Sequence, residues 1–280
     1  MKTLINLLIP VFILGFIVSG FTDKAATTQS ILIQSSGKNI SSELLSQSAK
    51  IATDRLNDFK IEDFSITMIP EKSQIRVTLN SSFDIESVEN LLTQKGTIGF
   101  YETFDHNGLA RLLNGDNTLF SLLTGSKTDN SGAKIGCTSI GAVEKVNDYL
   151  KILGLDQKCK FAWTRNFAGS DICLYALKNN GEKGAIITGT DIESARYDQE
   201  RIQIKLKPSA YGLWSDATRR NINSVIAIVV DDNVISAPLV RSAIDSGAIE
   251  ITGSFTAKEG NYLAAIMNNG ELPVSFFIIK

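Results

Sequence analysis

The chain has 280 residues, of which 43% are hydrophobic and 21% charged, a composition typical of a globular protein and not of a disordered one. Its formal net charge of −2 provides no basic surplus, which argues against nucleic acid as a partner. The length allows one or two domains with a substantial core.

The first segment of the chain is predicted to lie outside that core. After Met1 and Lys2, residues 3–22 contain no charged side chain. A positive start followed by an apolar run is typical of an export signal, and Val18-Ser19-Gly20 offers small residues for cleavage. The run is also long enough to span a bilayer, so residues 1–22 are either a cleaved signal peptide or a membrane anchor. Both alternatives leave the bulk of the chain outside the cytoplasm.

Residues 23–104 show a regular order of elements. Strand patterns occur at 30–36, 64–70, 74–80 and 96–104, and helical patterns occur at 41–56 and 84–92. The order is β-α-β-β-α-β, which predicts a ferredoxin-like unit closed by "GTIGFYETF".

Residues 185–280 repeat this order with one extra strand. The strand patterns are "RIQIKLK", "SVIAIVV", "NVISA", "GAIEITG" and "LPVSFFII". One helix is expected after Pro208, and a second begins at the capping-box pattern of Thr256 and Glu259 and stops at Gly270. The predicted fold class is therefore α+β, with two ferredoxin-like halves forming a base.

An insertion, residues 105–184, separates the two halves. It contains a helical pattern at 143–153 and a hairpin of "KFAWTR" and "DICLYALK". If the hairpin is centred near Ala168, Cys159 and Cys173 are not opposite each other, and Cys137 is the expected partner of whichever cysteine is oxidised. One disulfide and three buried thiols both remain possible. The length of the segment and its own helix and hairpin predict a subdomain joined by two short hinges.

The hairpin "VVDDNVISAPLV" raises the question of a catalytic serine. Ser236 would need a base within hydrogen-bond reach, and the single histidine, His106, lies in a predicted turn far along the chain. No nucleophile-elbow motif surrounds Ser236. Asp231 and Asp232 suit a tight bend, where we expect them to be solvated. A hydrolase is the weakest hypothesis, and we expect no enzymatic activity.

Other sites have little support in the sequence. One histidine and the absence of a CxxC pair argue against structural zinc, and neither a phosphate loop nor a dinucleotide motif occurs, so we expect no cofactor. The insertion does carry aromatic side chains that form either its own core or a groove for unfolded polypeptide. The candidates for polypeptide binding are Phe120, Phe161, Trp163, Phe167 and Tyr175.

The carboxy-terminal third resembles the end of the first periplasmic domain of SecD, a subunit of the bacterial protein-export machinery. The resemblance covers about residues 42–104 and 184–279, while the insertion matches only in position. The residues that carry the family motif are Asp231, Ser236, Ala237, Pro238, Gly253, Phe255, Thr256, Gly270, Leu272 and Pro273.

The resemblance implies a periplasmic accessory protein of preprotein translocation. Its head, the insertion, would contact exported polypeptide and swing about hinges at Phe104, Asp105, Glu182 and Gly184. Translocon membrane subunits are further expected partners, with membrane contact through residues 3–22 if these are retained. The membrane helices that carry the proton-coupling groups of SecD have no counterpart here, so no proton-driven motor is expected. The alternative is a stand-alone periplasmic binding or scaffold module without a role in export.

Overall fold

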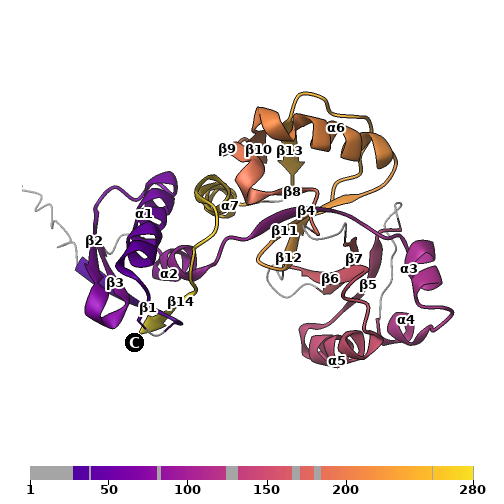
Figure 1. The fold of residues 1–280 in the computed structure, drawn as a ribbon, viewed down its shortest axis with the longest axis horizontal. Coiled ribbons are helices and arrows are strands. Elements are labelled where there is room, and N and C mark those ends of the chain that lie inside the picture. The colour runs from indigo at the N-terminus through magenta and orange to yellow at the C-terminus, as the bar shows by residue number, and fades with distance from the viewer. Residues whose placement is uncertain are drawn as a thin grey trace, which may run out of the picture.

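The computed structural model describes residues 28–37, 39–80, 83–123, 132–165, 171–179, 184–253 and 255–279. The fold is α+β, with three β-sheets of four, three and seven strands. Figure 1 shows the four-stranded sheet at one end of an elongated molecule and the seven-stranded sheet towards the other. Residues 3–22, predicted as a signal or anchor, lie outside the described residues.

The four-stranded sheet follows the order β14-β1-β3-β2, and each neighbouring pair is antiparallel. Helices α1 and α2 accompany it. Helix α1 begins where the Ser41 side chain accepts from the backbone N–H of Leu44, and it buries Leu45, Ala52 and Leu56 at helical spacing. The elements are β1 Thr28–Ser35, α1 Ser42–Asp58, β2 Phe64–Ile69, β3 Gln74–Asn80, α2 Ile85–Thr93 and β14 Phe276–Ile279.

The closing strand of this sheet comes from the end of the chain. We predicted that residues 96–104 would close it, but β4 (Ile98–Glu102) pairs with β11 and β8 in another sheet. Strand β14 pairs with β1 instead, with Ile33 opposite Ile278. The first predicted β-α-β-β-α-β unit is therefore present, but its last strand is β14, which follows α2 only after most of the other elements.

The seven-stranded sheet has the order β5-β7-β6-β12-β11-β4-β8. A bridge between Thr103 and Leu177, with a hydrogen bond from the N–H of Phe104 to the carbonyl of Ala176 (2.8 Å), brings the end of β4 onto β7 and curls the sheet. Helices α3 (His106–Leu112), α4 (Thr118–Leu122) and α5 (Val143–Leu153) lie near its β5–β7 end (Figure 1). The strands are β5 Lys134–Thr138, β6 Cys159–Thr164, β7 Ile172–Lys178, β8 Ile187–Thr188, β11 Ile226–Val230 and β12 Asn233–Ser236.

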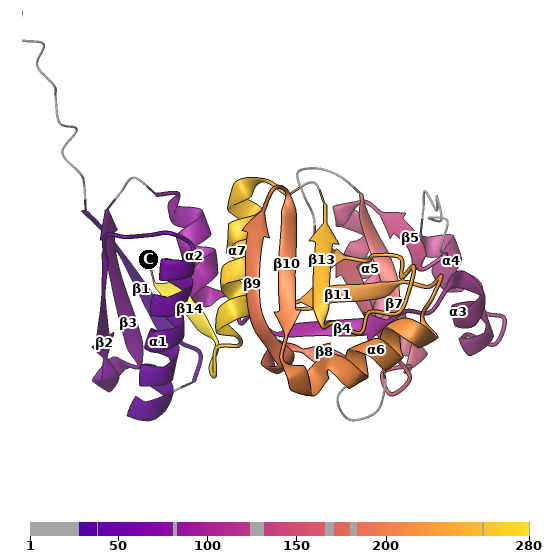
Figure 2. The same ribbon diagram turned by 90° about the horizontal axis from the view of Figure 1, so that it is seen from above.

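The three-stranded sheet has the order β13-β10-β9. Its strands are β9 Ile192–Asp198, β10 Arg201–Leu206 and β13 Ala248–Thr252, and the accompanying helices are α6 Tyr211–Arg220 and α7 Ala257–Asn269. Figure 2 shows α7 between the four-stranded unit and this sheet. The prediction that residues 185–280 form a second ferredoxin-like half is wrong, because the strands of that segment divide among all three sheets.

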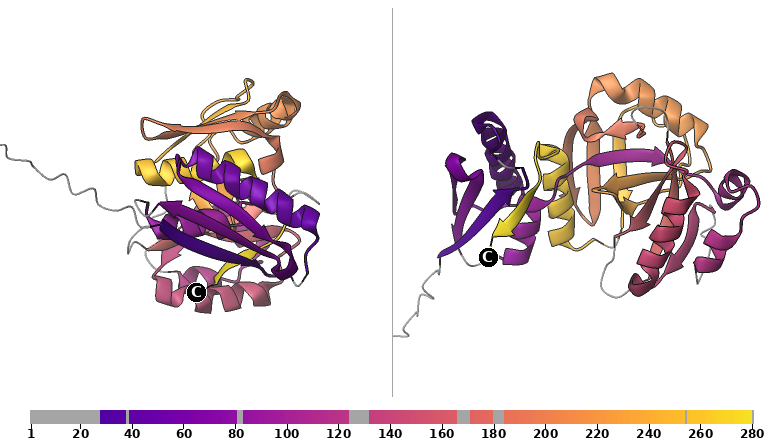
Figure 3. Two further views of the ribbon diagram at one scale, coloured as in Figure 1. Left: turned by 90° about the vertical axis from the view of Figure 1, so that its left-hand side faces the viewer. Right: turned by 60° about the horizontal axis from the view of Figure 1, so that its bottom comes forward.

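The largest buried cluster spans all three sheets. It joins the four-stranded unit, the three-stranded sheet, α7 and strands β4 and β11 in one core that includes Leu56, Val88, Ile204 and Ile266. A separate cluster, around Leu109, Leu119 and Leu174, lies within the predicted insertion. The insertion thus has a core of its own, although its strands β5–β7 share a sheet with β4, β8, β11 and β12. Figure 3 shows the arrangement of the sheets and helices from two further sides.

Cys137 and Cys173 form a disulfide between the paired strands β5 and β7, and Cys159 is free and buried. Strands β6 and β7 pair with Trp163 opposite Leu174 and Cys159 opposite Lys178, so Cys159 does not face Cys173. The expectation that Cys137 supplies the partner is confirmed. Across the described part of the chain, no helix combines the length and the apolar character needed to cross a membrane.

Candidate functional site

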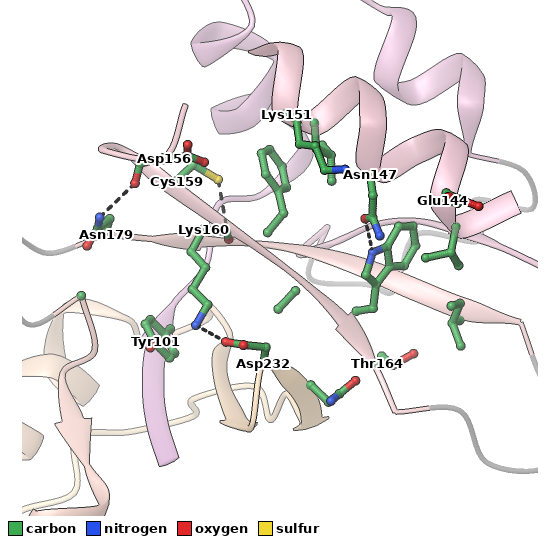
Figure 4. Close-up of a pocket in the computed structure, with 18 of the residues that line it drawn as sticks. Tyr101, Glu144, Asn147, Lys151, Asp156, Cys159, Lys160, Thr164, Asn179 and Asp232 are labelled. Carbon is green, nitrogen blue, oxygen red and sulfur yellow. Dashed lines mark hydrogen bonds and ion pairs between the residues drawn. The ribbon is translucent and has the colours of Figure 1, made fainter. Parts of the chain in front are cut away.

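A groove of about 1130 Å³ runs along β6 between α5 and the turn that joins β11 to β12. Its volume exceeds the range of about 300–1,000 Å³ usual for small-molecule pockets. Figure 4 shows the side chains that line it.

Apolar side chains from α5 and β6 lie on one side of the groove, together with Glu144, Asn147 and Lys151 of α5. Phe161 and Trp163 point to the same face of β6, because side chains at every second strand position share a face. Val143 and Leu150 approach from α5, where positions seven apart return to the same side of a helix. The indole N–H of Trp163 donates to the side-chain oxygen of Asn147 at 2.8 Å, which fixes the ring against the helix.

Charged and polar side chains form the other side. The Lys160 ammonium donates to Asp232 at 2.6 Å and lies 5.5 Å from the centre of the Tyr101 ring. Figure 4 shows Lys160 pointing to this side of β6, with Tyr101 and Asp232, while Asn147 and Glu144 lie beyond the opposite face. Burial alone would lower the pKa of Lys160, but the hydrogen bond with Asp232 and the nearby Tyr101 outweigh it and raise that pKa. Lys160 therefore remains charged at neutral pH.

The five aromatic candidates do not gather in one place. Phe161 and Trp163 line the groove. Phe120 instead stacks on the ring of His106, with ring centres 4.3 Å apart. Tyr175 is buried in the interior of the curled sheet, and Phe167 lies outside the described residues. We did not predict Val143, Leu150, Lys160 or Tyr101 as groove residues, because the sequence indicates only a helix at 143–153 and strands for the other two.

The hairpin turn of Asp231 and Asp232 has a structural role. We expected both acids to be solvated in the bend, where the positive φ angles of 46° and 65° do occur. The Asp231 carboxylate, however, accepts from the backbone N–H of Gly96 (2.9 Å) and of Thr97 (2.7 Å). The expectation of simple solvation is therefore wrong for Asp231, which ties the turn to the segment between α2 and β4.

Ser236 lies at the end of β12, opposite Ile228 of β11. The ring of His106 is 3.1 Å from the carbonyl of Ile135, far along the chain from this hairpin. Among the residues with described positions, no cluster of three or more histidine, cysteine or acidic side chains could hold a metal ion.

The remaining motif residues follow β12 or surround α7. The Thr256 side chain and Glu259 form the expected capping box, and Gly270 ends the helix with a φ of 67°. Leu272 is buried, and its N–H donates to the carbonyl of Lys95 at 2.8 Å.

Ala237 packs against the interior of the curled sheet, and the carbonyl of Pro238 accepts from the N–H of Ile226. Gly253, Phe255 and Pro273 are the other members, in the links around α7.

The predicted hinge residues lie where β4 and β7 end. Phe104 is bonded to β7 as described, and the Asp105 side chain caps α3 by accepting from the N–H of Gly108 at 2.6 Å. Gly184 adopts a φ of 62°, and Glu182 lies outside the described residues. Their action as hinges stays a prediction.

Comparison with known proteins adds sequence and fold relationships. Residues 175–274 match the family model described as "SecDF, P1 head subdomain". This match falls mainly on β8 to α7, the segment that we assigned to the second half of the base. The chain is 35% identical over 112 residues to the protein translocase subunit SecD of Calditerrivibrio nitroreducens, which covers 38% of this chain and 21% of the relative.

Two solved structures share the fold. A crystal structure of SecDF in "Super-membrane-facing form" superimposes with a TM-score of 0.55 at 18% identity and covers 90% of this chain and 29% of that one. A second structure, of "a membrane component SecDF that enhances protein export", gives a TM-score of 0.50 at 18% identity over 90% of this chain and 98% of that one.

The chain thus spans about a fifth of the length of the curated relative that it matches. Residues 175–274 thus match the SecDF P1 head subdomain in sequence, and most of the chain is similar in fold to the SecDF structures. The chain resembles the P1 region of SecD and SecDF.

Proposed function

We propose that this chain acts in protein export as a SecD-type accessory component and holds exported polypeptide in the groove along β6. The observation that carries the proposal is the groove itself. It has an apolar side with Phe161 and Trp163 and a polar side with Lys160 and Asp232, and its size suits a chain segment better than a metabolite. The fold shared with a SecDF membrane component that enhances protein export supports the same proposal.

The proposal also concerns the division into base and head. The four-stranded sheet with α1 and α2 would form the base, and the excursion from β4 to α7 would form the head. The chain leaves the base through residues 94–97 and returns through residues 270–272. These two segments are the two chain connections between base and head, and the predicted hinges lie elsewhere, at 104–105 and 182–184. We further expect a periplasmic location and contact with translocon membrane subunits.

Photocrosslinking in an export-active strain would test the groove. The chain offers a matched pair of exposed isoleucines, because Ile140 is 67% exposed and lines the groove, whereas Ile152 is 80% exposed on α5 and does not line it. A photoreactive amino acid at position 140 should crosslink to an exported chain arrested during translocation, and the same group at position 152 should give much less product.

Equal crosslinking from both positions, or none from position 140, would contradict binding in the groove. A deletion strain assayed for precursor accumulation tests the role in export separately. If export is unchanged and a partner outside the translocon is recovered, the chain is a stand-alone binding or scaffold module.

A further inference from the structure

Strand β6 is paired very differently along its two edges. On one edge, β7 pairs with Cys159 through Trp163. On the other edge, β12 pairs only with Trp163 and Thr164. Within the described ranges, no strand covers Cys159–Ala162 on the β12 side, and this uncovered stretch lines the groove.

The alternation of the ladder shows which main-chain groups face the groove. The carbonyl of Lys158 accepts from the N–H of Asn179 across the β7 edge at 3.2 Å. In an antiparallel pair, successive residues alternate between the two edges, so the N–H and C=O of Phe161 face away from β7. The N–H of Arg165, an even number of positions from Phe161, faces the same edge, because it donates to the carbonyl of Val234 in β12 at 3.2 Å.

The space beside Phe161 is therefore bounded by a strand edge and by two different walls. The wall on the α5 side combines the apolar side chains of Trp163, Val143 and Leu150 with Glu144, Asn147 and Lys151. The opposite wall is polar, with the Lys160–Asp232 ion pair. A strand added to this edge would place alternate side chains against the wall with Trp163, Val143 and Leu150 and against the wall with the Lys160–Asp232 ion pair.

We propose that the groove takes its polypeptide as an added β-strand, through main-chain hydrogen bonds to Phe161 on the uncovered edge of β6. This inference rests on the proposed function and specifies how the same site recognises its substrate. The fitting segment is extended, with apolar and polar residues in alternation. Because main-chain bonds supply the affinity, recognition depends on conformation and alternation more than on a particular sequence, as in other β-addition sites. Such tolerance suits a component that meets many different exported chains.

Peptide binding to the intact protein tests this mode. The probe is a short fluorescent peptide of alternating threonine and valine with a lysine at each end, and its binding is measured by fluorescence anisotropy. Two derivatives carry N-methyl groups on the backbone nitrogens of alternate residues. In the first derivative these are the odd-numbered residues of the peptide, and in the second they are the even-numbered ones. An added strand uses only one of its edges, so one derivative should bind at least about tenfold more weakly, and the other should bind like the parent peptide.

Equal binding of both derivatives and the parent would overturn strand addition while leaving polypeptide binding in the groove intact. Equal loss in both derivatives would likewise overturn it, because a single paired edge predicts an asymmetry. Failure of the unmodified peptide to bind, together with no crosslink from position 140, would overturn the proposed function as well.

A pair of variants checks the edge from the protein side. Phe161→Pro removes the N–H that faces the groove, and Phe161→Ala removes the ring but keeps that N–H. The proline variant should bind the peptide at least about fivefold more weakly than the alanine variant. Retention of the Cys137–Cys173 disulfide and of the thermal transition shows that each variant is folded. Equal affinities in two folded variants would contradict the assignment, and the N-methyl experiment decides the matter if the proline variant fails to fold.

Discussion

Arg55 donates a hydrogen bond to the carbonyl of Gly270 at 2.6 Å, although 215 positions separate the two residues along the chain. The guanidinium is fully buried and also donates to the carbonyls of Leu91, Gln94 and Lys95. It therefore joins α1 to the two segments through which the chain leaves and re-enters the four-stranded unit. Burial lowers the pKa of Arg55 to about 10, so the group is still charged at neutral pH.

Arg55→Met is expected to destabilise the fold by about 3–5 kcal/mol, because one buried and three partly buried carbonyls lose a charged donor. Arg55→Lys should recover only part of this loss, since an ammonium cannot reach four acceptors in a fixed fork. Chemical denaturation measures both. Arg76→Met, at an exposed arginine of β3, is the control and should change stability by less than about 0.5 kcal/mol. Similar losses at positions 55 and 76 would contradict the role of Arg55.

Gly96 lies next to the contact between Arg55 and Gly270. A Cβ atom there would overlap the Arg55 guanidinium and lie 2.9 Å from the carbonyl of Gly270, and the φ of Gly96 is 83°. Gly115 has a nearly identical φ of 86°, but a Cβ there would meet nothing within 4 Å. Gly115→Ala should therefore cost about 1 kcal/mol for the backbone alone, and Gly96→Ala about 3 kcal/mol or more. Equal melting temperatures for the two variants would show that the junction relaxes freely.

A third prediction concerns acid stability. Hydrogen bonds from Lys258 and Ser87 lower the pKa of Asp84 to about 2, so the ionised carboxylate stabilises the folded state above its ordinary pKa near 3.8. That stabilisation is lost as the pH falls through about 2. Asp84→Asn keeps a capping acceptor for α2 but cannot titrate, so its unfolding free energy should depend less on pH between about 4 and 2.

The partner variant supplies the control for Asp84. Lys258→Met should weaken the same pH dependence, and the double variant should resemble Asp84→Asn, because the ion pair between α7 and the start of α2 is then already absent. Parallel pH curves for the parent and Asp84→Asn would rule out this contribution.

Local patterns in the sequence were sufficient for individual elements but not for their partners. The capping box at Thr256 and the existence of the β6–β7 hairpin could be predicted, because both depend on neighbouring residues. The choice between β4 and β14 as the closing strand could not be predicted, since both are short apolar strands and only the wider fold decides which one pairs with β1. The bonds from Gly96 and Thr97 to Asp231 span 135 and 134 positions, so a solvated turn was the simpler local interpretation.

The candidate site shows the same limit. Its aromatic residues on β6 stood out by composition, whereas its uncovered edge arises from the short pairing of β12, which no local pattern of β6 reveals. Phe120 and Tyr175 carry the same kind of side chain, but packing against His106 and within the curled sheet gives them other surroundings.

The last prediction uses the cysteines as reporters of the groove. Burial raises the pKa of Cys159 to about 12, and its side chain is inaccessible at the start of β6, so the free thiol should be inert in the native protein at pH 8. Titration with a chromogenic disulfide reagent should detect no thiol in native buffer and one thiol in denaturant. It should detect all 3 cysteines after reduction, because Cys137 and Cys173 are then released. A thiol that reacts quickly in native buffer would show that β6 separates from its core, and the edge proposed to receive an added strand would then not be a fixed surface.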